Sequence, residues 1–143
     1  MVIVAAIDHS KRATDILEEA TALAEKFDDE VHVLHVMKRS EAIQVEEDTN
    51  RDEPASTDEL REQAAKPAVA LVDANPTAVE TTPVGRIGDP ASEIVEYAEE
   101  QDARYVVLSP RRRSQTGKIL FGSVAQSVLL NAHCPVVSLV EQE

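Results

Sequence analysis

The sequence predicts an α/β fold, a doubly wound parallel sheet of five strands with helices on both faces. Short apolar runs rich in β-branched residues alternate along the chain with segments of helical periodicity. The first of these runs is apolar throughout, as in a central parallel strand that is covered on both faces. The length of 143 residues suits one domain, residues 1–143, with a single core. Right-handed crossovers then give the doubly wound arrangement.

The first half of the chain predicts strand, helix, strand. Residues 2–7 form the opening strand, which ends at Asp8. Ser10 is the expected N-cap of a helix whose apolar side chains recur every three or four residues up to Phe27. Residues 31–37 form the second strand. His32 and His35 lie within it and are predicted to share one face, as packing or edge residues rather than metal ligands.

The middle of the chain predicts a flexible acidic loop over about residues 39–56, because it is polar and has no sustained period. Ser56 and Glu59 then form a possible capping box for a helix to about residue 73. Pro67 predicts a kink or a break within that helix. Residues 77–87 are β-rich, and Pro83 suits an edge strand.

The last third predicts two further helices and two further strands. Asp89 is the expected N-cap of the first helix, with Pro90 at its first position. Residues 105–108 form the fourth strand. The final helix opens at Gly122-Ser123, with Ser123 as the expected N-cap, and residues 136–140 close the chain as a fifth strand.

The composition bears on which partners and which compartment we expect. A formal net charge of -13 opposes binding to nucleic acid and to anionic membranes, and it suits a protein from a salt-rich cell. With two Phe, two Tyr and no Trp, stacking on nucleic acid bases is not expected. No run is long enough to span a membrane. A single cysteine allows no internal disulfide, so we expect a reducing cytoplasm.

The loop between residues 109 and 122 predicts an anion site. It leaves the carboxyl end of a strand, which is where parallel sheets bind ligands, and it leads into a helix whose free N–H groups favour an anion. Periodicity alone does not fix the strand order. If the order is 3-2-1-4-5, Asp8 lies beside this loop at the point where the sheet reverses direction.

The whole chain resembles the universal stress protein family. The resemblance rests on Asp8 after the first strand, on His35-Val36, on Gly88-Asp-Pro90, and above all on Gly122-Ser-Val124 with Cys134-Pro-Val136. It implies a small cytoplasmic domain with strand order 3-2-1-4-5 that forms a homodimer through its last strand. It also implies that Asp8 and Val36 meet the ribose and adenine of a nucleotide, and that Gly122, Ser123 and Val124 offer donors to its phosphates.

The ATP-binding branch of that family has a loop of Gly, two residues, Gly, nine residues, then Gly followed by Ser or Thr. Here the spacing is kept, but Ser109 and Arg112 stand at the first two glycine positions. A side chain there hinders close approach of the backbone to phosphate. Arg111 and Arg112 could offset the loss, since arginine recognises phosphate bidentately. We expect ATP binding to be weakened or lost.

Two function hypotheses follow. The first is a universal stress protein-like regulatory protein that is not an enzyme and that binds an unidentified protein partner as a homodimer. The second is a sensor that binds ATP with Mg through Asp8, Val36 and the loop ending at Gly122-Ser123, with Ser109, Arg111, Arg112 and Val124 as further candidates. A nucleotide-hydrolysing enzyme is a third class, but no general base or metal-ligand cluster can be assigned to it.

Overall fold

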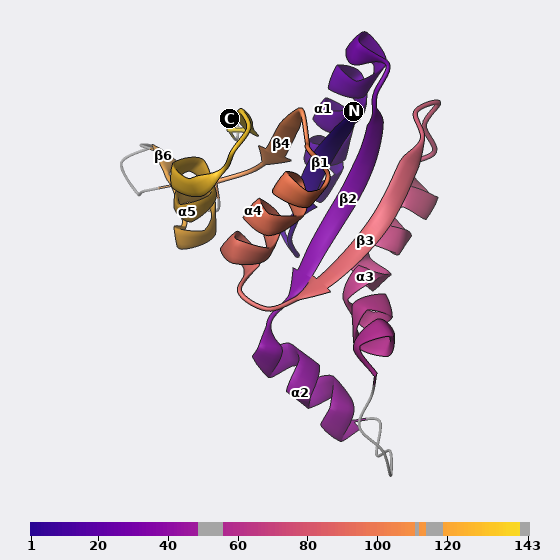
Figure 1. Ribbon diagram of the computed structural model, residues 1–143, viewed down its shortest axis with the longest axis vertical. Coiled ribbons are helices and arrows are strands. Elements are labelled where there is room, and N and C mark those ends of the chain that lie inside the picture. Colours follow the sequence, from indigo (N-terminus) through magenta and orange to yellow (C-terminus); the bar gives the residue numbers. More distant parts are fainter. Residues whose placement is uncertain (49–55, 111, 114–118, 141–143) are drawn as a thin grey trace.

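The computed structural model describes residues 1–48, 56–110, 112–113 and 119–140 (Figure 1). The main sheet has five parallel strands in the order β3-β2-β1-β4-β7, and β5 and β6 form a separate antiparallel pair. The predicted order 3-2-1-4-5 is therefore confirmed. The strands are β1 (Val2–Ile7), β2 (Glu30–Met37), β3 (Thr81–Ile87), β4 (Tyr105–Leu108), β5 (Arg112–Arg113), β6 (Ile119–Leu120) and β7 (Val136–Ser138). The helices are α1 (Ala13–Phe27), α2 (Arg39–Asp48), α3 (Thr57–Ala74), α4 (Pro90–Glu100) and α5 (Ser123–Asn131).

The core consists of two apolar layers, one on each face of the sheet. All six side chains of β1 are buried, as expected for a strand covered on both faces. Ile3, Ala5 and Ile7 pack on one face with α1 and α3. Val4 and Ala6 pack on the other face with α4 and α5. The alternation of strand side chains thus divides the core between two pairs of helices.

Helix α3 lies close against the edge strand β3 at Gly85. A Cβ atom on Gly85 would collide with the backbone of α3, at the carbonyl oxygen of Arg61, at the nitrogen of Ala65, and at the carbonyl carbon of Ala64 at 2.8 Å. Glycine is thus required here by space. Pro83 lies in the same strand as Gly85 and pairs with Val33 of β2. Its place in an edge strand is as predicted.

Two of the predicted helix starts are confirmed. The side chain of Ser56 accepts the Glu59 N–H at 3.1 Å as the N-cap of α3. The side chain of Asp89 accepts the Ser92 N–H at 3.1 Å, with Pro90 in the first turn of α4. Both use a short polar side chain to satisfy an N–H that the helix itself leaves free.

The other two predicted caps are wrong. Arg12 is the N-cap of α1, and Ser10 instead accepts the Arg12 N–H at 3.2 Å in the turn before it. Gly122 is the N-cap of α5, so Ser123 is its first helical residue. Helix α1 thus begins two residues later than predicted, after a turn, whereas α5 begins one residue earlier than predicted.

The predicted acidic loop over residues 39–56 is wrong for its first ten residues, which form α2. Ala42 is buried and packs beside Met37 and Ala64, and Val45 lies against the same cluster. Two small apolar anchors, Ala42 and Val45, therefore hold a helix whose other residues are largely polar. Figure 1 shows α2 beyond the carboxyl end of β2. Residues 49–55 lie outside the described part of the chain.

Helix α3 continues through Pro67 to Ala74, so of the two predicted outcomes, a kink or a break, the break does not occur. The strand β7 ends at Ser138, two residues earlier than predicted, although the Leu139 N–H still donates to the Leu108 carbonyl at 2.9 Å. In the described part of the chain, none of the helices has the length and apolar character needed to cross a membrane.

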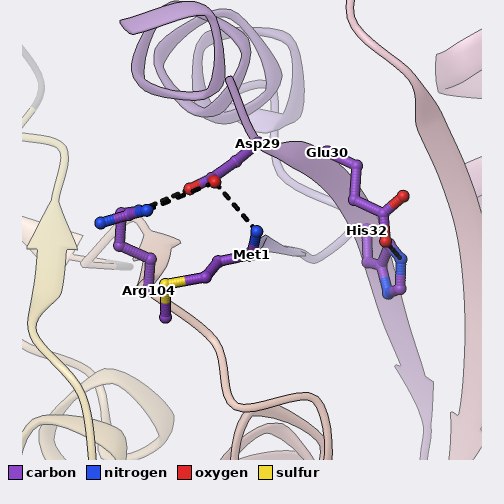
Figure 2. Close-up of polar contacts among 5 residues, drawn as sticks. All are labelled: Met1, Asp29, Glu30, His32 and Arg104. Atoms are coloured by element: carbon purple, nitrogen blue, oxygen red, sulfur yellow. Dashed lines mark hydrogen bonds and ion pairs between the residues drawn. The ribbon is translucent and has the colours of Figure 1, made fainter. Parts of the chain in front are cut away.

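A buried carboxylate ties together three chain segments at the amino end of the sheet (Figure 2). Asp29 lies just before β2, and its side chain is only 2% exposed. It accepts Nε of Arg104 at 2.5 Å and lies 3.0 Å from the amino group of Met1. The hydrogen bond from Arg104 holds the pKa of Asp29 below its ordinary value.

The two histidines of β2 lie on opposite faces of the sheet, so the prediction that they share a face is wrong. Positions three residues apart in a strand point in opposite directions. His32 lies on the α4 side, with Nδ1 2.5 Å from the Tyr97 hydroxyl and Nε2 3.2 Å from Glu30. His35 lies on the α3 side, with Nδ1 2.7 Å from the Ala64 carbonyl.

Candidate nucleotide site

A cavity of about 130 Å³ opens at the carboxyl edge of the sheet, where β1 and β4 lie side by side. In an α/β sheet with this strand order, that is the point where the direction of winding reverses. Six of the eight residues predicted from the sequence line it: Asp8, Val36, Ser109, Gly122, Ser123 and Val124. The fold therefore brings together residues from four separate parts of the chain.

Asp8 follows β1 directly and is half-buried. Its Oδ1 accepts the Ser10 N–H at 2.8 Å, which shapes the turn into α1. Val36, near the end of β2, packs against the α4 and α5 layer of the core. The two residues come from adjacent strands, because Ile7 pairs with His35 one position before each of them. Side chains at these positions can reach the same small ligand.

Ser109 occupies the first of the two substituted glycine positions. Its hydroxyl lies 3.1 Å from the Leu139 carbonyl, to which it can donate, and 3.3 Å from its neighbour's carbonyl at Pro110. Pro110 carries no N–H. This part of the loop is therefore bonded to the segment after β7, and it offers few backbone donors to a ligand.

Arg112 occupies the second substituted position. Its backbone lies in β5, opposite Leu120 of β6. Strand pairing places this residue in extended backbone within a short antiparallel pair. Arg111 lies outside the described residues.

The start of α5 faces the cavity. The cap residue Gly122 has φ -67°, an ordinary extended value, and it contributes no side-chain hydrogen bond. The first intrahelical bond runs from the Gln126 N–H to the Gly122 carbonyl at 3.0 Å. The N–H groups of Ser123, Val124 and Ala125 precede it and have no acceptor within the helix. They form the kind of site that holds an anion.

The cavity also has lining residues that the sequence did not single out as site residues: His9, His35, Lys38, Glu41, Pro90, Ile94, Leu108, Ala125, Ala6 and Ile7. Glu41 comes from the segment predicted as a loop, and Lys38 lies just before that segment, after β2. Their place at the end of β2 is the signal that could have found them, since ligands bind at strand ends. His35 is 4% exposed, and burial lowers its pKa below the ordinary 6.5.

The described residues include no group of three or more His, Cys, Asp or Glu side chains placed to hold a metal ion. Among the described residues, the charged side chains that line the cavity are the carboxylates Asp8 and Glu41 and the ammonium Lys38. The chemistry available is that of binding: backbone donors at α5, carboxylate acceptors beside β1 and α2, and an apolar floor.

A model of the universal stress protein family matches residues 1–139. The chain belongs to the universal stress protein family. The match spans every element that lines the cavity. The resemblance read from Asp8, Val36 and the Gly122-Ser123 segment is thus confirmed at the level of the family.

Individual proteins similar to this chain are also universal stress proteins. Universal stress protein MJ0531 of Methanocaldococcus jannaschii is 31% identical over 137 residues, which cover 94% of this chain and 79% of that protein. A solved universal stress protein from Archaeoglobus fulgidus is 29% identical, covers 96% of each chain and has a TM-score of 0.65. Another, from Archaeoglobus fulgidus in complex with dAMP, is 25% identical, covers 96% of this chain and 94% of that one, and has a TM-score of 0.61.

Proposed function

We propose that this universal stress protein acts by binding, and that its cavity takes an adenine nucleotide through the base, the ribose and one phosphate. The observation that carries the proposal is the convergence of Asp8, Val36 and the Gly122–Val124 segment on one cavity. A similar protein has been solved in complex with dAMP, which carries one phosphate.

The polarity of the cavity suits the parts of such a ligand. Val36, Ile94 and Leu108 supply apolar surface for the flat faces of a base. Asp8 supplies a carboxylate that can accept a ribose hydroxyl, beside the N–H of Ser10 that it already holds. The first N–H groups of α5 would then hold a phosphate by hydrogen bonds and by the helix dipole.

A second and a third phosphate have less to hold them. In the ATP-binding branch of the family, glycines at positions 109 and 112 leave backbone free for close approach. Here the hydroxyl of Ser109 is within reach of the Leu139 carbonyl, and the backbone of Arg112 lies in β5. We therefore propose that a monophosphate binds more tightly than Mg-ATP.

The test is calorimetric titration of AMP and of Mg-ATP into the protein in molar KCl, beside an Arg112→Gly variant. We expect AMP to bind more tightly than Mg-ATP, and the variant to gain affinity for Mg-ATP with little change for AMP. Equal or tighter binding of Mg-ATP by the wild type would mean that the arginine loop replaces the glycines. Absence of binding by either nucleotide would overturn the proposed function.

Turnover is not part of the proposal. Incubation of the protein with ATP or AMP should leave the nucleotide intact over hours. A hydrolysis rate that Asp8→Ala abolishes would instead make the protein an enzyme.

A half-buried single cysteine, Cys134, fits the reducing cytoplasm that we propose as its compartment.

We further propose a homodimer through β7. This strand is an edge of the main sheet, pairing with β4 alone in the described part of the chain. Apolar side chains in the last segment of the chain are exposed: Leu130 at 81% and Leu129 at 41% on α5, Phe121 at 41% just before α5, and Val140 at 38% after β7. The hydroxyl of Ser138 in β7 is buried without a hydrogen-bond partner. A second copy would cover the edge and this apolar surface together.

The dimer is tested by sedimentation or light scattering at micromolar concentration in molar KCl. We expect a dimer for the wild type and a monomer for Leu130→Glu, which puts a charge into the proposed interface. Ile43→Glu is the matched control, because Ile43 is 57% exposed on α2, far along the chain from β7. A monomeric wild type would contradict the proposal.

A further inference from the structure

His35 is a buried imidazole that lines the nucleotide cavity. It lies near the end of β2, one residue before Val36, and is 4% exposed. Its Nδ1 lies 2.7 Å from the carbonyl oxygen of Ala64 in α3. A carbonyl oxygen can only accept, so Nδ1 must carry a hydrogen and donate it. This contact fixes the tautomer of the neutral ring.

The other ring nitrogen of His35 is then an acceptor. A neutral imidazole with hydrogen on Nδ1 has a lone pair on Nε2. No hydrogen bond to Nε2 occurs among the residues that the structure describes. In the same part of the chain, two side-chain polar atoms are fully buried without a hydrogen-bond partner, Arg12 Nε and Ser138 Oγ. Nε2 of His35 is not among them, so it is not fully buried. Nε2 is therefore an accessible acceptor without a partner among these residues, on a side chain that lines the cavity.

The surroundings of His35 keep this acceptor available. Burial lowers the pKa of His35, and the nearby ring of His9 acts in the same direction. The Ala64 carbonyl from α3, Glu41 from α2 and Asp8 from the end of β1 raise it, but burial is the largest cause. The His9 ring meets that of His35 edge-on, with centroids 4.8 Å apart. The ring is thus held in place from two sides and stays neutral near pH 7.

We infer that His35 is a specificity-determining residue, whose Nε2 accepts a hydrogen bond from an N–H or O–H group of the bound nucleoside. The inference rests on the proposed nucleotide function. Asp8, which lines the same cavity and whose charge acts on His35, puts the acceptor near the part proposed for the ribose and base rather than the phosphate. The donor is the amino group of adenine or a ribose hydroxyl. In either case a ligand that lacks the donor leaves a buried acceptor without its partner, which costs affinity.

Substitution of His35 by asparagine isolates the acceptor. The asparagine amide can still donate to the Ala64 carbonyl in place of Nδ1, but it has no atom at the position of Nε2. We expect His35→Asn to bind AMP about 3- to 10-fold more weakly than the wild type, the effect of one hydrogen bond. His32→Asn is the matched control, since His32 lies in the same strand on the opposite face and does not line the cavity. It should bind AMP as the wild type does.

The choice of ligand identifies the donor. IMP replaces the amino group of adenine by a carbonyl oxygen, and dAMP lacks the 2′-hydroxyl. Weaker binding of IMP to the wild type, with the difference reduced in His35→Asn, assigns the donor to the amino group. The same pattern for dAMP assigns it to the ribose. Wild-type binding of AMP, IMP, dAMP and 3′-deoxy-AMP, which lacks the other ribose hydroxyl, with equal affinity would overturn the inference.

Nitrogen NMR of the histidine rings reports on Nε2 directly, whether or not a variant folds well. In the free protein we expect His35 to show hydrogen on Nδ1 and a free lone pair on Nε2. Saturation with AMP should move the Nε2 resonance in the direction of a hydrogen-bonded acceptor and leave the signals of His32 in place. Affinity should also fall as the pH drops below the pKa of His35, because protonation turns Nε2 into a donor.

Two outcomes separate this inference from the proposed function. If AMP binds the wild type and His35→Asn equally, and the Nε2 resonance does not move, the inference is overturned while nucleotide binding stands. If no adenine nucleotide binds the wild type, both are overturned.

Discussion

At Gly85 the backbone of α3 comes into close contact with the edge strand β3. The missing side chain of Gly85 lets the backbone of α3 pack directly on β3, at Arg61 and Ala65. The same contact places the Ala64 carbonyl where it accepts the hydrogen from His35. One absent methyl group therefore supports both the packing of α3 and the orientation of a cavity side chain.

Replacement of Gly85 by alanine should destabilise the protein by about 2–4 kcal/mol. The added Cβ collides with backbone atoms, which cannot move aside as a flexible side chain can. Urea denaturation gives the free energy of unfolding for the comparison. Thr82→Ala, at an exposed position in the same strand, should change it by less than about 0.5 kcal/mol. A Gly85→Ala protein of wild-type stability would show that α3 can shift without cost.

Asp29 should give the protein a pH-dependent share of its stability. The folded state lowers the pKa of Asp29 below the ordinary 3.8, chiefly through the hydrogen bond from Arg104. That contribution is complete above pH 3.8 and is lost as the pH falls through the lower folded value. Asp29→Asn should therefore cost about 1–3 kcal/mol at pH 7 and progressively less below pH 4. Denaturation curves of both proteins from pH 7 to pH 3 measure the difference, and a gap that does not narrow in acid would contradict this account.

At the residue scale, the cavity could be predicted from the sequence because its residues stand where a strand ends or a helix begins. Asp8 ends an apolar run, and Gly122-Ser123 follows a loop, so their neighbourhood can be inferred from topology. His35 could not be assigned in this way. It lies inside a strand, and its partner is a backbone carbonyl of α3, twenty-nine residues along the chain. A hydrogen bond to a backbone carbonyl requires no particular residue type at the partner position, so the sequence carries no pattern that reveals it.

At the scale of the element, α3 tolerates a proline in its interior. Pro67 removes one N–H from the helical ladder, yet the helix extends from Thr57 to Ala74. Ala64 and Ala68, fully buried on either side of Pro67, anchor both halves of one continuous helix. Tertiary packing here outweighs a local preference that predicted a break.

Substitution of Pro67 by alanine should stabilise α3. Alanine restores the missing N–H and has the higher helix propensity, so the free energy of unfolding should rise by about 1–3 kcal/mol. Urea denaturation beside Lys66→Ala, an exposed neighbour in the same turn, separates this gain from a general effect of added alanine. A loss of stability in Pro67→Ala would mean that the proline ring itself packs better than alanine in this half-buried position.

Helix α2 shows why some elements escape sequence analysis. Its residues are mostly charged or polar, and its apolar anchors, Ala42 and Val45, are too small and too few to set a helical period. The helix exists because Met37 and Ala64 offer those anchors a place to pack. That packing site is formed by the folded sheet and α3, so the sequence of residues 39–48 alone does not reveal it. The same helix brings Glu41 to the cavity.

At the scale of the whole molecule, charge opposes folding. The chain carries 27 acidic residues against 14 Lys and Arg, a net charge of -13. Compaction brings these charges together, and the repulsion among them reduces the stability of the folded state. Salt weakens the repulsion, since the screening length falls from about 10 Å at 0.1 M to about 3 Å at 1 M.

The free energy of unfolding should therefore rise steadily as KCl increases from about 0.1 M to 1 M and beyond. Urea is the denaturant of choice, because guanidinium is itself a salt. A triple variant, Glu18→Gln, Glu62→Gln and Glu96→Gln, removes three exposed negative charges and leaves the buried core unchanged. It should be more stable than the wild type at low salt and gain less from added KCl. If the variant and the wild type gain equally, salt acts by strengthening apolar burial, as excluded solutes do, and charge repulsion is not the limiting term.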